Sequence, residues 1–271
     1  MAGAQRDTRN QGSQAYWPLL LGLPILCLLV VPLLALVLRI RFPLLFASLE
    51  DRQVMQAIRL SLTTSLISTA CALFFGTPLA YWLARHKFRG RTVIDTLIDL
   101  PMVLPPSVAG IALLIAFGRR GLLGVYLNEL GISLAFTTAA VICAQVFVAA
   151  PFYIKAAIMG FAGVDRDLEQ AAAIDGANGW HVFRAITLPL AWPVLFGGAV
   201  MRWARALGEF GATIIFAGNF PGRTQTMPLA IYIGFEVDLT VALTLSVILL
   251  VISFLVLFIV KGLLRQRVGI G

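Results

Sequence analysis

The sequence predicts an all-α membrane protein with six transmembrane helices, and three observations lead to this fold class. The mean hydropathy is +0.91, and 59% of the 271 residues are hydrophobic. Only 13% are charged, about half the share of an average soluble domain. The apolar residues are gathered into runs of about 20, the length that a helix needs to cross a hydrocarbon core of about 30 Å.

The apolar runs predict the spans one by one. The first follows Arg6 and Arg9 and is too long for the apolar part of a cleaved signal peptide, so we expect it to remain as a helix. The spans form one domain, 17–260, between a tail at 1–16 and a tail at 261–271, which leaves no room for a soluble domain. Five runs are free of charge, and the run 190–217 is not; the predicted spans are 17–38, 60–84, 100–118, 130–154, 190–217 and 239–260.

The basic residues predict the orientation. If the N-terminus is cytoplasmic, twelve Lys and Arg residues lie in cytoplasmic segments and seven lie in segments on the other side. Short cytoplasmic loops are enriched in Lys and Arg, so we place both termini and the loop 155–189 in the cytoplasm. The same loops account for the net charge of +8. No basic patch is interleaved with aromatic residues, which argues against a nucleic-acid partner.

Cysteine and histidine give no sign of a metal site. Cys27, Cys71 and Cys143 all lie within apolar runs, and His86 and His181 are far apart. None of these residues has the spacing of metal ligands, so we interpret the cysteines as buried apolar thiols.

The third predicted span begins with three prolines, Pro101, Pro105 and Pro106. Proline removes a backbone donor, so a straight helix is not expected here. Broken backbone at membrane depth is tolerated where protein or a water-lined cavity satisfies it. The break is therefore either a packing kink or part of the wall of a pathway.

The loop 155–189 contains signals for a first helix. Asp165 is a suitable N-cap, and Asp167 and Glu169 follow in the first turn, where the helix dipole favours negative charge. Ala171–Ala173 extend the helix and leave a smooth surface. Gly176 can adopt a positive φ and end it.

A second short helix is expected directly afterwards. Asn178 can cap it, and Trp180 and Phe183 lie at i and i+3 on one face. Leu188-Pro189 then ends the loop and begins the next span. The helix pair is either a docking surface for a protein outside the membrane or an interfacial pair lying on its own bundle.

The spacing of residues in this loop resembles the EAA loop of ATP-binding-cassette (ABC) importer permeases. In that family the loop forms the coupling helix, which docks on the nucleotide-binding subunit. The glutamate position of the motif is Gln170 here, and Glu169 stands one residue earlier, so a salt bridge assigned to that position is not expected. On this resemblance the coupling residues are Glu169, Gln170, Ala171, Ala172, Asp175, Gly176, Ala177, Phe183, Ile186, Leu188 and Pro189.

Four further segments make the resemblance specific to one branch of this family. Residues 100–106, 117–121, 205–213 and 216–226 are similar to the molybdate permease subunits of this family, and slightly less to the sulfate permeases. The resemblance runs from about residue 55 to 260. It implies import of a tetrahedral oxyanion across a bacterial inner membrane, molybdate first, with tungstate and sulfate as alternatives. It also implies a periplasmic or extracellular oxyanion-binding protein and a second permease copy, as a homodimer or as a heterodimer.

The sequence does not predict an enzyme. The phosphate-binding pattern G-x-x-x-x-G-K-[ST] is absent, so ATP and Mg are expected on a partner ATPase subunit and no cofactor is expected in this chain. An ion-coupled carrier is the main alternative. It would need titratable groups within its spans, where only Glu209 qualifies, and no inverted-repeat helix breaks are evident. A channel or an assembly factor would leave the elaborate loop without a purpose.

Three charges lie inside the predicted span 190–217. Arg202, Arg205 and Glu209, at i, i+3 and i+7, share one helical stripe. Arg205 and Glu209 can pair, which would leave Arg202 as an uncommitted cation for a passing oxyanion. The alternative is an ion-paired clamp between helices. The hypothesis for the pathway comprises Pro105, Pro106, Arg202, Arg205, Glu209 and Thr213.

The segment after this span predicts an external turn. Pro221-Gly222 is typical of a type II turn. It is either a plain connector or part of the surface that receives the delivery protein. The candidate external residues are Asn219, Arg223, Thr224 and Gln225, whose polar groups an oxyanion would accept.

Overall fold

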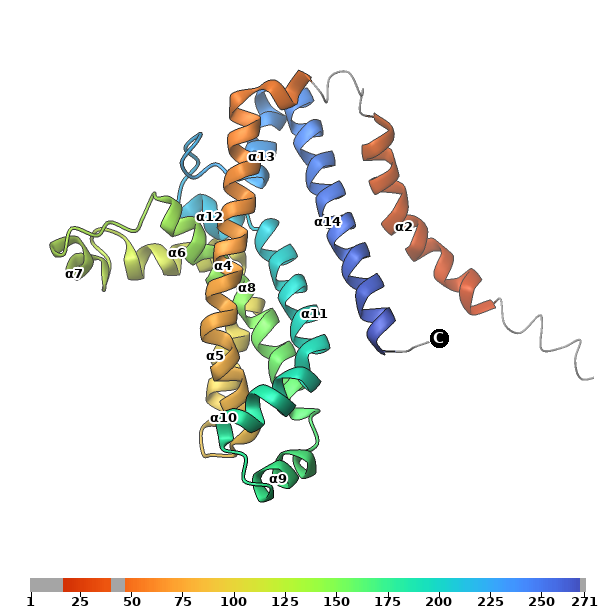
Figure 1. Ribbon diagram of the computed structural model, residues 1–271. Coiled ribbons are helices and arrows are strands. Elements are labelled where there is room, and N and C mark those ends of the chain that lie inside the picture. The colour runs from red at the N-terminus through yellow and green to blue at the C-terminus, as the bar shows by residue number, and fades with distance from the viewer. Residues whose placement is uncertain (1–16, 40–46, 269–271) are drawn as a thin grey trace, which may run out of the picture.

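The computed structural model describes residues 17–39 and 47–268, and within these ranges the chain is helical without a strand (Figure 1). The tail 1–16 lies outside the described residues. The helices are α2 (Trp17–Arg39), α4 (Arg52–Arg85), α5 (Arg91–Val103), α6 (Pro106–Phe117), α7 (Gly124–Glu129), α8 (Thr138–Ala162), α9 (Arg166–Ile174), α10 (Gly179–Val182), α11 (Leu188–Leu207), α12 (Gly211–Phe216), α13 (Met227–Val237) and α14 (Leu239–Val268), with a π-helical turn η1 (Phe183–Thr187) before α11.

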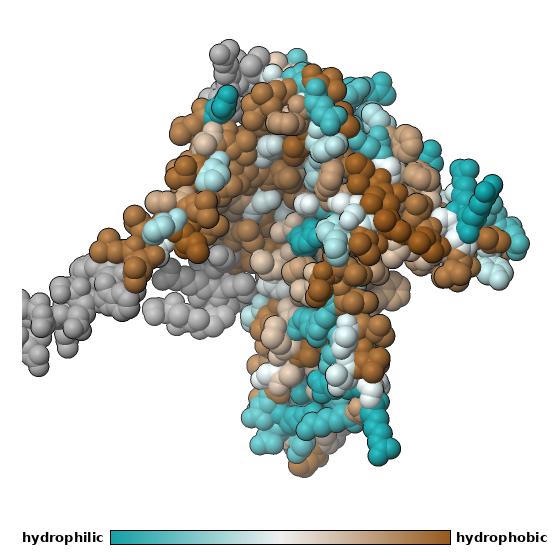
Figure 2. Space-filling model, turned by 180° about the vertical axis from the view of Figure 1, so that it is seen from behind, coloured by the Kyte–Doolittle hydropathy of each residue, from teal (hydrophilic) through white to brown (hydrophobic). Residues whose placement is uncertain are grey.

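Five stretches within the described residues are long and apolar enough to cross a membrane. A sixth candidate is the pair α5 and α6, if the two are counted as one bent span. The predicted all-α membrane fold is therefore confirmed. Figure 2 shows apolar side chains over most of the visible face, while hydrophilic side chains gather at the end that carries α9. The five stretches are Leu20–Arg39, Arg52–Arg85, Thr138–Ala162, Gly179–Leu207 and Leu239–Val260.

The third span is broken where its prolines predicted. The axes of α5 and α6 differ by 115°, and the chain turns at Leu104 and Pro105. The helix before the break, α5, begins at Arg91, whereas the predicted span begins at residue 100. The prediction placed the start too late because Asp95 and Asp99 lie within α5 and interrupt the uncharged run in the sequence. These two carboxylates are paired with Lys155 of α8, at 3.7 and 2.9 Å.

The fourth span differs from its predicted bounds of 130–154. α8 begins after Thr137, whose side chain accepts a hydrogen bond from the amide of Ala140, and it runs to Ala162. Lys155 is therefore part of α8 and not of the loop. Neutralisation by the aspartates of α5 allows this lysine to lie within the helix.

The predicted continuous span 190–217 is also broken. α11 ends at Leu207, and the short α12 begins at Gly211. α12 packs closely on α6: a Cβ added to Gly211 would lie 2.6 Å from Cβ of Pro106. The expectation of one continuous span was therefore wrong. The two breaks lie on helices that contact each other.

The core lies between α4, α8 and α11, which run side by side (Figure 1). Small residues on α8 let its neighbours approach; a Cβ on Gly160, for example, would lie 3.0 Å from Leu195 of α11. At one side α14 lies beside α2, whose apolar window is exposed throughout, as suits a lipid-facing helix. α14 continues to Val268, so most of the predicted tail 261–271 is helical.

Candidate functional site

The loop between α8 and α11 has the two capped helices that its sequence predicts. The carboxylate of Asp165 accepts a hydrogen bond from the amide of Asp167 at 3.0 Å and begins α9. Gly176 follows α9 with a φ of +92°, a conformation that residues with a Cβ rarely adopt. The side chain of Asn178 then accepts a hydrogen bond from the amide of His181 and begins α10. The pair lies at the lower end of the bundle (Figure 1).

Leu188-Pro189 does not interrupt the chain in the predicted way. α10, η1 and α11 form one continuous helix from Gly179 to Leu207. Proline is tolerated near the start of α11, because a wide π-helical turn precedes it. The transition from loop to span therefore lies at Gly179, and the π-helical turn was not predicted.

The predicted coupling residues divide into two groups by exposure. α9 has no buried residue, and Gln170, Ala171, Asp175 and Gly176 are exposed at the end of the molecule. Pro189 is also exposed, whereas the other group is half-buried: Glu169, Ala172, Ala177, Phe183, Ile186 and Leu188. Two apolar side chains outside the predicted set are exposed on α9, Leu168 at 50% and Ile174 at 86%.

Phe183 anchors this unit to the spans. Its ring centroid lies 5.0 Å from that of Tyr81 on α4 and 6.1 Å from that of Phe161 on α8. Trp180 stacks on Phe183 at 5.8 Å, as their spacing predicts, but remains 68% exposed. The aromatic pair therefore has a half-buried member, Phe183, that packs on the spans and an exposed member, Trp180.

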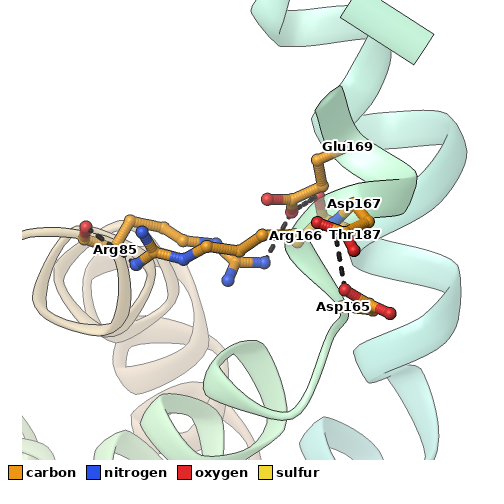
Figure 3. A network of polar contacts seen from close by, with 6 residues as sticks. All are labelled: Arg85, Asp165, Arg166, Asp167, Glu169 and Thr187. Atoms are coloured by element: carbon orange, nitrogen blue, oxygen red, sulfur yellow. Dashed lines mark hydrogen bonds and ion pairs between the residues drawn. The ribbon is translucent and has the colours of Figure 1, made fainter. Parts of the chain in front are cut away.

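Glu169 joins α9 to two other elements (Figure 3). Its Oε1 atom accepts a hydrogen bond from Nη2 of Arg85, the last residue of α4, at 2.5 Å. The same oxygen accepts a second hydrogen bond, also at 2.5 Å, from the hydroxyl of Thr187 at the end of η1. Nη2 of Arg166 donates to the backbone oxygen of Arg85. The two arginine side chains thus cross between α4 and α9 in opposite directions (Figure 3).

Arg202 is not the uncommitted cation that the sequence predicts. It is fully buried, and Nη1 donates to Thr69 Oγ1 at 2.6 Å and to Ser68 Oγ at 3.0 Å, both on α4. Nη2 donates to the backbone oxygen of Gln145 on α8 at 3.2 Å. The side chain therefore holds three helices together through neutral acceptors, which is a correction to its predicted role.

Arg205 and Glu209 form the predicted pair, with Nη1 and Oε2 2.8 Å apart. The Arg205 side chain is 32% exposed, whereas that of Glu209 is 1% exposed. Glu209 also accepts a hydrogen bond from the amide of Ala212 and so caps α12. Thr213 follows one residue later and is buried. Of the three charges on the predicted stripe, Arg205 is the one that reaches the surface.

The external turn has the predicted shape, since Gly222 follows Pro221 with a φ of +73°. Its polar residues, however, do not gather around Arg223. Thr224 is fully buried and accepts a hydrogen bond from the amide of Phe220, and Gln225 is 8% exposed. The turn folds back through hydrogen bonds to the Phe220 carbonyl, which draws both side chains inward.

Arg223 lines an open hollow of about 730 Å³ together with Arg119, which the sequence analysis did not include in the site. The hydroxyl of Thr138 at the start of α8 donates to the backbone oxygen of Arg223 at 2.9 Å and fixes the turn. Asn219 is half-buried and does not line this hollow. The remaining wall comes from the segment before α8 and from the turn itself.

Comparisons with known proteins agree with these features. Residues 76–270 match the family described as the binding-protein-dependent transport system inner membrane component. The molybdenum transport system permease protein ModB of Mycobacterium tuberculosis is 42% identical over 218 residues, which cover 80% of this chain and 81% of that protein. ModB of Escherichia coli is 44% identical over 178 residues, or 65% of this chain and 78% of that protein.

Another relative is named for the transport of a different anion, sulfate. The sulfate transport system permease protein CysW of Synechococcus elongatus is 38% identical over 223 residues, covering 82% of this chain and 78% of that protein. Among solved structures, a bacterial ABC transporter involved in alginate import superposes with a TM-score of 0.73 at 18% identity, over 94% of this chain and 96% of that one. This structural likeness concerns the fold alone.

Proposed function

Because the chain belongs to the family of binding-protein-dependent transport system inner membrane components, we propose that it is the permease subunit of an ABC importer for molybdate. The observation that carries the proposal is the 42% identity to a molybdenum permease over four fifths of the chain. The five apolar helices and the bent pair provide the membrane-spanning part.

We infer that α9 and α10 form the surface on which the ATPase subunit docks, on the cytoplasmic side. Leu168 and Ile174 on α9 and Trp180 on α10 are exposed apolar side chains at one end of the bundle. Exposed apolar groups rimmed by polar residues mark protein interaction sites. ATP and Mg belong to that partner, because the chain has no phosphate-binding loop of its own.

We also propose that two copies of the permease enclose the pathway. Six spans are few to surround a passage, and twofold dimers are the commonest oligomers. A homodimer is the simplest arrangement, with a heterodimer as the alternative. Both termini would lie in the cytoplasm of a bacterial inner membrane, as the distribution of basic residues favours.

The anion reaches the permease from a delivery protein outside the membrane. One of the solved relatives in fold is an alginate transporter in complex with its periplasmic protein, which supports a partner of this kind in general. Arg119 and Arg223, which line one hollow, are the candidates to meet it. Within the membrane, the pathway includes Arg205, together with Pro105 and Pro106 at the break of the third span.

Sulfate is the second candidate anion, because the sulfate permease CysW is 38% identical. Molybdate, tungstate and sulfate are all tetrahedral dianions, so the delivery protein is expected to select among them. The deciding experiment is ATP-dependent uptake of labelled molybdate into vesicles that contain this chain, its ATPase subunit and the delivery protein, with tungstate and sulfate as competitors. Uptake driven by an ion gradient without ATP would contradict the proposal.

The docking surface can be tested separately with Ile174→Asp. A charge at this exposed apolar position should weaken association with the ATPase subunit. The matched control is Val237→Asp, whose native side chain is 81% exposed. Val237 is the last residue of α13, a helix at the other end of the bundle (Figure 1). Equal association of both variants would rule out α9 as the docking helix.

A further inference from the structure

The helix that carries the proposed docking surface has little packing of its own. No residue of α9 is buried, and it lies against α10 and η1, the first turns of the helix that continues into α11. Movement of α9 can reach the spans along the chain or through side-chain contacts. Among the described residues, the hydrogen bonds between helices that involve side chains of α9 come from Glu169 and Arg166, three residues apart on one face.

Both contacts converge on the end of α4. Arg85 is its last residue; its guanidinium binds Glu169 and its carbonyl oxygen accepts from Arg166. The side chains of Arg85 and Glu169 are only 10% and 15% exposed, so water competes weakly for this ion pair. Figure 3 shows the contacts around Glu169, in which α9 is held at the level of the last turn of α4.

The same carboxylate oxygen also holds the start of α11. Thr187 is fully buried and is the last residue of η1, so its hydroxyl lies directly before α11. π-helical turns occur frequently at functional sites, where they change the direction of a side chain within a continuous helix. One oxygen atom thus connects α9 with α4 and with α11, two spans that pack on each other and share the buried Arg202.

We propose that Glu169 is the positioning residue that transmits movement of the docking helix to α4 and α11 together. The inference rests on the proposed function, since it requires an ATPase subunit on α9. It assigns different roles to neighbouring residues: Gln170 and Ala171 face the partner, whereas Glu169 faces the spans. Loss of the carboxylate charge should separate docking from transport and leave the docking surface intact.

The test compares Glu169→Gln with Asp167→Asn in vesicles that contain the full chain, its ATPase subunit and the delivery protein. Both variants remove one negative charge from the first turn of α9, but Asp167 is exposed. We expect both to bind the ATPase subunit like the wild type. Glu169→Gln should raise the ATP hydrolysed per molybdate imported by about tenfold, within the range known for residues between coupled sites. Asp167→Asn should leave this ratio unchanged.

A charge exchange provides the rescue. The double variant Arg85→Glu with Glu169→Arg restores opposite charges at the same two positions and should recover much of the coupling that each single variant loses. Thr187→Val removes one hydroxyl without a charge and should give a smaller loss in the same direction. Amide hydrogen exchange of the full chain in lipid discs, without partners, should show faster exchange in α9 for Glu169→Gln.

The outcomes separate this inference from the proposed function. If the wild-type chain recruits no ATPase subunit, both proposals fail. If recruitment and import are normal but Glu169→Gln retains the wild-type ratio, the positioning role is wrong. Loss of ATPase binding in Glu169→Gln would also overturn it, because the carboxylate would then belong to the docking surface. Failure of the double variant to improve on both single variants would overturn the direct link to Arg85.

Discussion

Nη1 of Arg205 lies 2.8 Å from Oε2 of Glu209, and this ion pair stands at the point where α11 ends and α12 begins. The carboxylate is buried and also accepts from the amide of Ala212, so it stabilises the break in the fifth span. The guanidinium remains about a third exposed. Of the two partners, Arg205 is therefore the one that is accessible to an anion.

Replacement of Arg205 by Gln should slow molybdate uptake, because a fixed cation lowers the barrier that a dianion meets in a low-dielectric passage. It also leaves Glu209 buried without its cation. Since the pair is partly exposed, we expect this to lower the free energy of unfolding by only about 1–3 kcal/mol. Arg205→Lys keeps the charge and is the control. Uptake per assembled complex distinguishes the effects, and equal uptake by both variants would remove Arg205 from the pathway.

Arg202 should behave as a structural residue. Arg202→Gln leaves hydroxyl and carbonyl groups on α4 and α8 without their charged donor, and each such hydrogen bond contributes about 1.5–3 kcal/mol. We expect a lower thermal unfolding temperature and poor assembly, in contrast to the specific transport defect that an uncommitted cation would show. A stable, assembled Arg202→Gln complex with slow uptake would restore the pathway role.

These two arginines illustrate what the sequence can reveal about the site. The i, i+4 spacing predicts the pair of Arg205 and Glu209, because both partners lie on one helix. The hydroxyl acceptors of Arg202, on Ser68 and Thr69 of α4, are more than 130 residues earlier and depend on how the helices pack. Local spacing cannot show this, and the same limit applies to Arg85 and Thr187, which hold Glu169 from two other elements.

The contact between the two broken spans should be sensitive to volume. A Cβ on Gly110 of α6 would lie 2.8 Å from Cβ of Ile215 and 2.9 Å from the backbone oxygen of Ala212. Gly110→Ala should therefore push α6 away from α12 and cost about 1–3 kcal/mol. Gly22→Ala on α2, with no atom within 4 Å, is the control. Thermal unfolding of the purified chain measures both, and equal stability would show that the two helices separate readily.

The spans are predicted well where a long apolar run marks them. The bounds of helices are predicted poorly where they depend on ion pairs between helices or on turns. Runs of 20 apolar residues locate the spans, and Pro105 locates the bend. The bounds of α5 and α8 escape prediction, because Asp99 and Lys155 look like loop residues until they are seen paired across the two helices. The short α13 was missed for a different reason: its 11 residues are too few to form a span.

The three cysteines should be dispensable. The predicted burial of the cysteines is wrong: Cys27 is exposed on α2, and Cys71 and Cys143 are half-buried, all as free thiols. No ion pair with any of them is present in the described part of the chain. Replacement of all three by Ala or Val should leave uptake within about twofold of the wild type, since small apolar exchanges cost little. Reaction with a membrane-permeant thiol reagent should be strongest at Cys27, and a large loss of uptake in a stable triple variant would contradict their passive role.

The backbone conformation of Gly176 should be critical for docking of the ATPase subunit. No heavy atom lies within 4 Å of an added Cβ, so a side chain at this position meets no neighbour, but φ is +92°. Gly176→Val would force a β-branched residue into this region at a cost of about 1–2 kcal/mol or change the angle between α9 and α10. We expect weaker binding of the ATPase subunit with the spans still inserted. Gly131→Val, at a φ of +75° and equally free of neighbours, imposes similar strain away from α9. Binding that is unchanged by Gly176→Val, or reduced equally by both variants, would show that the α9–α10 turn does not shape the docking surface.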